Sequence, residues 1–160
     1  MPKLPSYLID RLGSLVQPYQ RRNELSPNTP QMSVESDGEK ERLQYHKLSE
    51  DGLPSDVKFT DKENPDVKDC YLWLVDKDCV KILFENTPCN TERGRAVHTN
   101  ITGCDPAYHG GELWFVSETE IILNHDSGRY DQGTPEEKQA VKEVFEYLGF
   151  KIIKITERRL

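Results

Sequence analysis

Short runs of β-branched and aromatic residues, separated by tight polar turns, dominate the sequence from Val57 onward. Residues 71–76 (YLWLVD) and 79–85 (CVKILFE) are separated by only Lys77 and Asp78, which is close enough for a hairpin, and their composition favours strands. Further strand-like runs occupy residues 95–101, 112–117, 119–125 and 150–156. The pattern predicts an α+β domain built on an antiparallel sheet of about five or six short strands.

One helix is predicted between the last two of these runs. Thr134-Pro135-Glu136-Glu137 combines an N-cap residue, proline at the first helical position and glutamate three residues after the cap. Apolar residues at 141, 144, 145 and 148 then lie along one face, and Gly149 is placed to end the helix in the left-handed conformation. This C-terminal helix is expected to pack on the sheet.

Residues 1–55 differ in composition from the single α+β domain expected over residues 56–160. They form a polar, proline-rich arm, and we expect residues 23–41 to be flexible because they have almost nothing to bury. Apolar residues at helical spacing predict a short helix over 6–17, and a second helix is predicted over 39–49. We expect the first helix to pack back on the domain, although it could instead dock a protein partner.

Charge and hydropathy exclude several classes of protein. No run approaches the roughly 20 apolar residues that span a bilayer, and the first residues lack the apolar region of a signal peptide. A cytoplasmic protein with no membrane association is therefore expected. The net charge of −7 does not support broad nucleic-acid binding, so such a role would need a local basic site. The candidates are Arg93, Arg95 and Arg129, whereas the basic residues at 151–159 are expected to be solvated.

Cysteine and histidine spacing predicts no metal site, and no cofactor is expected. The cysteines at 70, 79, 89 and 104 include no C-x-x-C pair and are expected to be free thiols. His98, Cys104, His109 and His125 offer four ligands, but their spacing matches no familiar metal-binding pattern.

Three polar segments hold most of the candidate chemistry, at residues 98–103 (HTNITG), 107–115 (AYHGGELWF) and 124–131 (NHDSGRYD). His98 is expected in a strand whose alternation places it on the same side as Asn100, where it is either a general base or a structural histidine. Arg129, beside Ser127 and Tyr130, is suited to hold an anion, or else it pairs with a neighbouring aspartate in the turn.

These segments resemble a known signature. The order HTNITG, GGELWF and SGRY, followed by a helix, is similar to the HSS-x-L-x-G, AGE and SGHY-P motifs of bacterial polymorphic-toxin-like and effector domains and of plant IQ-motif calmodulin-binding proteins. The resemblance extends from His98 to about Leu148. Arg129 stands where the signature usually has histidine, so the resemblance supplies no second histidine there. The matching positions are His98, Thr99, Glu112, Ser127, Arg129 and Tyr130.

Domains with this signature are similar to the barnase, EndoU and RelE-like group of small ribonucleases, which implies a toxin-like or effector-like, metal-independent endoribonuclease. In that scheme a base removes the ribose 2′-hydroxyl proton, a cation stabilises the pentavalent phosphate and an acid protonates the leaving oxygen. The resemblance implies His98 as base, Arg129 as phosphate clamp and Tyr130 or His125 as acid. Thr99 and Ser127 would position the RNA, with Asn100 and Glu112 as further substrate-binding residues.

Two other functions fit the same sequence. Glu112 could polarise the ribose of NAD or another nucleotide in a transferase, although no phosphate-binding glycine fingerprint is present. Alternatively, an acidic chain with a flexible arm and a rigid domain is typical of an adaptor or inhibitor that binds a protein partner without catalysis.

Overall fold

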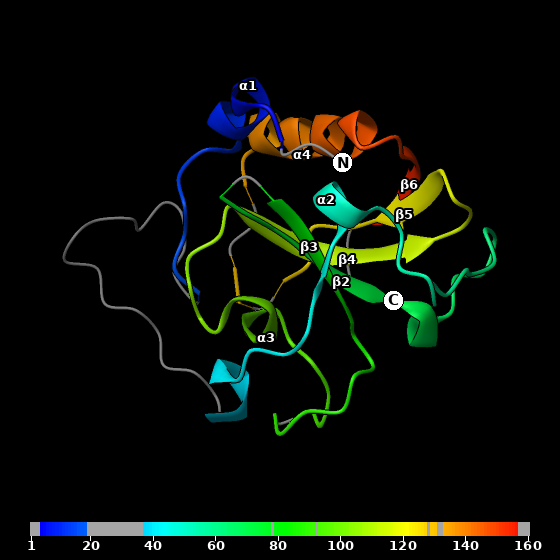
Figure 1. Ribbon diagram of the computed structural model, residues 1–160. Coiled ribbons are helices and arrows are strands. Elements are labelled where there is room, and N and C mark those ends of the chain that lie inside the picture. The colour runs from blue at the N-terminus through cyan, green and yellow to red at the C-terminus, as the bar shows by residue number, and fades with distance from the viewer. Residues whose placement is uncertain are drawn as a thin grey trace.

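A computed structural model describes residues 4–18, 37–77, 79–91, 93–127, 129–130 and 133–156. The predicted α+β class is confirmed, with a six-stranded sheet in the order β1-β3-β2-β4-β5-β6 (Figure 1). The strands are β1 (His46–Lys47), β2 (Tyr71–Asp76), β3 (Cys79–Phe84), β4 (His109–Phe115), β5 (Glu120–Leu123) and β6 (Lys151–Ile155).

The sheet is antiparallel except at one edge. The β2–β3 hairpin pairs in the predicted register, with Asp76 opposite Cys79, and β4 pairs with both β2 and β5. The last strand departs from the prediction because β6 runs parallel to β5. The intervening helix α4 (Pro135–Tyr147) carries the chain back to the end of the sheet at which β5 begins. A parallel pairing requires such a crossover connection.

Helix α4 begins and ends as predicted. The Thr134 hydroxyl accepts a hydrogen bond from the Glu137 amide, and the Glu137 carboxylate accepts one from the Thr134 amide. After the helix, Gly149 has φ of +96°, a left-handed conformation that favours glycine. These local signals suffice because both ends are set by contacts within a few residues.

The two faces of the sheet carry different covers (Figure 1). On one face, Trp73, Phe115 and neighbouring apolar side chains pack against α4 and against the N-terminal residues 4–12 in the main core. On the opposite face, Leu72 and Leu74 pack beneath α3 (Thr99–Thr102) and Tyr130 in a smaller core. The second face is the one that carries the candidate site.

The strand predicted over residues 95–101 is wrong. Its second half forms the single helical turn α3, and Gly103 at φ +67° ends it. The Asn100 carboxamide oxygen accepts a hydrogen bond from the Val97 amide, which closes the turn locally. Polar side chains that bond nearby backbone groups compete with strand pairing in this way, so the alternation expected for His98 and Asn100 does not apply.

The N-terminal helices are shorter than predicted. The stripe over 6–17 forms α1 (Ser6–Ile9) and a 3₁₀ turn, η1 (Asp10–Leu12), with Leu8 and Leu12 buried in the main core. The expectation that it packs back on the domain is confirmed. The helix predicted over 39–49 is wrong, because η3 (Asp37–Lys40), β1 and α2 (Leu48–Asp51) divide that stretch.

Flexibility was predicted for residues 23–41, most of which lie outside the described residues. In the described part, 37–41, Gly38 and Glu39 are buried in the 3₁₀ turn η3, whereas the other three residues are exposed. Within the described residues, no helix has the length and apolar character needed to cross a membrane.

Candidate functional site

A pocket of about 140 Å³ opens on the α3 side of the sheet. Its floor is β2 and β4, and its walls are the loop after β3, the start of α3 and the loop after β5. Segments far apart in the sequence therefore meet here, including parts of all three polar motifs. The polar residues that line it are Glu85, Arg93, His98, Glu112, Asp126 and Arg129.

His98 lies in the pocket wall with both ring nitrogens engaged. Nε2 lies 2.8 Å from the Gly111 carbonyl oxygen and donates to it, so Nδ1 is the unprotonated nitrogen and accepts from the Ser127 hydroxyl at 3.1 Å. Burial lowers the pKa of His98 to about 4. The ring is consequently neutral and fixed in one tautomer at physiological pH.

Ser127 organises the loop that carries Arg129 and Tyr130. Its hydroxyl oxygen accepts hydrogen bonds from the amides of both residues, at 3.2 and 3.1 Å, while its proton goes to His98. Hydroxyl groups that bond amides two and three residues on are typical of a tight turn. The SGRY motif and the HTN motif are thus joined by one hydrogen bond.

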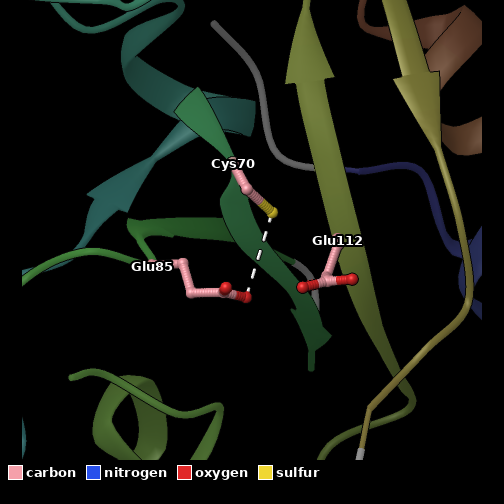
Figure 2. Close-up of side chains that lie close together, drawn as sticks. All are labelled: Cys70, Glu85 and Glu112. Atoms are coloured by element: carbon pink, nitrogen blue, oxygen red, sulfur yellow. Dashed lines mark hydrogen bonds between the residues drawn. The ribbon is translucent and has the colours of Figure 1, made fainter. Parts of the chain in front are cut away.

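Two carboxyl groups face each other at the floor of the pocket. Glu112 on β4 and Glu85 after β3 are 3% and 5% exposed, and Figure 2 shows both side chains pointing toward one another beside Cys70. Burial, followed by hydrogen bonding and repulsion from Glu85, raises the pKa of Glu112 to about 8. The Asn124 amide donates to Glu112 at 3.1 Å and fixes its orientation.

Because Glu112 stays protonated up to about pH 8, the carboxyl pair holds a proton at neutral pH. Ionising both of two adjacent buried carboxyl groups is unfavourable because their negative charges repel each other. The pair therefore keeps one proton, and the carboxylate is stabilised by its protonated neighbour. Such a pair can accept a proton at one oxygen and release one from another. Arg95 lies 3.8 Å from Glu85 and adds a positive charge at the rim.

The same corner contains the residues best suited to hold a metal. The Cys70 sulfur and one carboxylate oxygen each from Glu85 and Glu112 lie within 4.8 Å of one another. The thiol is 3.9 Å from Glu85, and the three side chains converge in Figure 2. Among the described residues, no comparable group forms from the histidines and Cys104 that the sequence offered as ligands.

Arg129 lines the pocket, but its guanidinium is paired with Glu39, which does not line the pocket. Its Nε donates to the Glu39 carboxylate at 2.6 Å, and the Thr99 hydroxyl donates to the same oxygen at 3.3 Å. Glu39 is fully buried and Arg129 is 8% exposed. The N-terminal segment therefore supplies the charge that balances Arg129.

Asn100 and Tyr130 face away from the pocket. The Asn100 carboxamide donates to the carbonyls of Gly38 and Glu41, at 2.9 and 2.8 Å, so it holds the N-terminal segment against α3. The Tyr130 hydroxyl donates to the Asp105 carbonyl at 2.6 Å, and burial raises its pKa. Both residues support the walls of the site.

His125 lies at a different pocket, on the α4 side of the sheet. Its ring packs edge-on against Trp73, with ring centroids 5.8 Å apart. Of the predicted site residues, the structure brings His98, Glu112, Ser127 and Arg129 together and separates His125 from them. Thr99 does not line the pocket but bonds the same Glu39 oxygen as Arg129.

Sequence reasoning missed Glu85, Cys70, Asp126 and Glu39. Glu85 had a usable signal, because it directly follows the strand-like run 79–84 and, by alternation, lies on the same side as the buried Leu83. Glu39 had no such signal, since it lies in a polar stretch with no periodicity.

Comparison of the chain with protein-family models, curated proteins and solved structures finds no match.

Proposed function

We propose that the protein is a metal-independent endoribonuclease of the toxin or effector kind, with Glu85 and Glu112 as its proton-transfer groups. The observation that carries the proposal is the carboxyl pair in the pocket, where burial and Glu85 raise the pKa of Glu112 to about 8. Pairs of carboxyl groups whose environments separate their protonation are typical of acid–base catalysis.

The reaction needs no group beyond the pocket and the RNA. The carboxylate of the pair takes the proton of a ribose 2′-hydroxyl, whose oxygen attacks the adjacent phosphorus as the bond to the 5′-oxygen breaks. The carboxylic acid of the pair returns a proton to that leaving oxygen. The products are a 2′,3′-cyclic phosphate and a 5′-hydroxyl, and the pair ends with the same number of protons.

Positive charge at the rim supports a phosphate substrate. Arg93 and Arg129 line the pocket, and Arg95 lies beside Glu85. These are the three residues that the sequence offered as a local basic site on an acidic protein. Arginine is suited to stabilise the extra negative charge of a pentavalent phosphate.

His98 takes a positioning role in this proposal. Its ring is neutral, with Nε2 committed to Gly111 and Nδ1 to Ser127, so the carboxyl pair is better placed to exchange protons with a substrate. The histidine instead fixes the Ser127 turn that presents Arg129.

The test is cleavage of pooled cellular RNA by the full chain in the presence of EDTA, scored by 2′,3′-cyclic phosphate ends. Glu85→Gln and Glu112→Gln are expected to lower the rate by about 10²–10⁴-fold, the usual contribution of general acid–base catalysis. Glu146→Gln, on the exposed face of α4, is the matched control and should cleave at the wild-type rate.

Three results would contradict the proposal. Wild-type protein that leaves RNA intact while folded would favour a protein-binding role, and turnover of NAD by the same sample would favour a nucleotide transferase. Cleavage that EDTA abolishes would assign Cys70, Glu85 and Glu112 to a metal instead.

A further inference from the structure

Three adjacent strands place Cys70, Glu85 and Glu112 on one face of the sheet. Cys70 immediately precedes β2 and Glu85 follows β3, and the Glu85 amide donates to the Cys70 carbonyl at 3.1 Å. On the other side of β2, Glu112 of β4 lies opposite Leu72. Because side chains two residues apart point to the same face, all three groups project on the side of Leu72 and Leu83. Strand register therefore sets the position of each group.

The donor atoms of these three side chains converge. The Cys70 sulfur and one oxygen from each carboxyl group lie within 4.8 Å of one another, and the sulfur is 3.9 Å from a Glu85 oxygen (Figure 2). Sulfur and oxygen ligands of one tetrahedral zinc, with bonds of about 2.1–2.3 Å to the metal, lie about 3.4–3.6 Å apart. Side-chain shifts of about 1 Å therefore bring all three donors onto one ion.

The group is buried, and one of its carboxyls is already oriented. Cys70, Glu85 and Glu112 are 1%, 5% and 3% exposed, and charges this deep are usually paired or bound to a metal. The Asn124 side chain donates to a Glu112 oxygen at 3.1 Å and accepts from the Glu112 amide at 2.9 Å. Outer contacts of this kind fix the orientation of metal ligands.

The mixture of donors selects the metal. One thiolate with two carboxylates suits zinc, whereas magnesium and calcium take oxygen ligands. Glu85 and Glu112 line the pocket, so the fourth position of the ion opens to it and takes a water molecule. Arg95 opposes a cation beside Glu85, but its side chain is 39% exposed and solvent screens its charge.

We propose that Cys70, Glu85 and Glu112 bind one zinc ion, and that this ion inhibits the carboxyl pair. Coordination releases the Cys70 thiol proton and the proton of the pair to solvent, and zinc then occupies the oxygens that exchange protons with RNA. Zinc binding rests on the geometry alone, whereas the inhibition rests also on the proposed ribonuclease function. The ion is thus an inhibitor of that reaction and not its cofactor.

Binding is tested by titrating the full chain with Co²⁺, which reports its ligands by absorption, and then displacing it with Zn²⁺. One equivalent of Co²⁺ should produce the charge-transfer band of a thiolate ligand, and one equivalent of Zn²⁺ should remove it. Cys70→Ser should lose the band and bind Zn²⁺ at least about tenfold more weakly, because loss of even an outer partner of a metal ligand costs about 10–100-fold. Cys79→Ser, which changes a buried thiol outside the cluster, should match wild type.

A second variant removes a carboxylate ligand and keeps the thiol. Glu85→Gln preserves the size of the side chain and should also weaken Zn²⁺ binding at least about tenfold. The inference therefore stays testable if Cys70→Ser fails to fold.

Inhibition is tested by comparing the RNA cleavage rate of each protein in EDTA with its own rate in a slight excess of Zn²⁺. Zinc should lower the rates of wild type and Cys79→Ser at least about tenfold, because it removes their acid–base groups. Cys70→Ser should keep its own EDTA rate. If wild type cleaves no RNA in EDTA, the ribonuclease proposal fails, and the cobalt band still decides whether the zinc site exists.

Three outcomes of the metal titration would overturn the inference. These are the absence of a thiolate band in wild type, a band that survives in Cys70→Ser, or equal loss of Zn²⁺ binding in Cys70→Ser and Cys79→Ser. Cleavage that rises with added Zn²⁺ would overturn the inhibitory role.

Discussion

Arg129 and Glu39 form a buried ion pair across ninety residues of sequence, with the guanidinium Nε 2.6 Å from a carboxylate oxygen. One partner lines the candidate pocket, and the other belongs to the segment before the sheet. The pair therefore makes the N-terminal segment a structural part of the site wall. Both groups are buried, so removing one charge takes the opposite charge 2.6 Å away from a group that has little access to solvent, which is the expensive case for an ion pair.

The first prediction concerns this pair. Glu39→Ala and Arg129→Ala should each lower the free energy of unfolding by about 3–5 kcal/mol, and the double variant should lose less than the sum. Urea unfolding of the four proteins measures the cycle. Arg11 and Glu143, an exposed pair 2.7 Å apart, supply the control, and Arg11→Ala should leave the urea midpoint nearly unchanged. Additive losses at 39 and 129 would contradict the coupling.

Asn100 should prove to be a structural residue. Asn100→Ala removes hydrogen bonds to Val97, Gly38 and Glu41, and an expected loss of about 2–3 kcal/mol in stability follows from the buried groups left unpaired. Hydrogen exchange should accelerate first at residues 37–43. Asn64→Ala, at an exposed position, should behave as wild type. Unchanged protection of residues 37–43 in the Asn100 variant would refute the assignment.

Glu112 should make stability fall as pH rises. Its pKa is raised from 4.5 to about 8, so between these values the folded state binds a proton that the unfolded state has released, and stability declines with pH. His98 acts oppositely, since its pKa is lowered from 6.5 to about 4 and stability rises across that window. In thermal melts from pH 5 to 8.5, the melting temperature of Glu112→Gln should rise relative to that of the wild type as pH increases. Parallel curves would exclude a raised pKa for Glu112.

Gly111 should tolerate no side chain. A Cβ there would lie 2.1 Å from the Asn124 carbonyl oxygen and 2.7 Å from the Trp73 indole nitrogen. Because both neighbours are buried and bonded to each other, Gly111→Ala should lower stability by about 3 kcal/mol. At Gly110 the nearest atom is 3.1 Å away, on His98, so Gly110→Ala should be milder. Equal effects of the two substitutions in urea unfolding would contradict this packing argument.

Local signals predicted much of the fold. The β2–β3 hairpin and the α4 caps were predictable because their determinants lie within a few residues of each other. Residues 95–101 were mispredicted because valine, isoleucine and threonine suggest a strand, while the decisive contact is the Asn100 side chain bonding the Val97 amide. The parallel pairing of β6 depends on where α4 returns the chain, which composition does not encode.

The candidate site was only partly predictable. Residues of the HTNITG, GGELWF and SGRY segments do meet at the pocket, which Glu112 lines. Its partner Glu85 and the counter-ion Glu39 reach the site only through tertiary packing, so neither had a motif of its own. The role of a residue such as His98 likewise depends on the groups that engage its two nitrogens.

The packing of residues 4–12 against α4 also has a consequence during synthesis. Leu8 and Leu12 leave the ribosome more than a hundred residues before Pro135, where the helix that covers them begins. Throughout that interval their apolar side chains lack the helix that α1 and η1 contact in the folded protein. Nascent chains stalled before residue 135 should therefore be held by chaperones through this N-terminal segment and released once α4 has emerged.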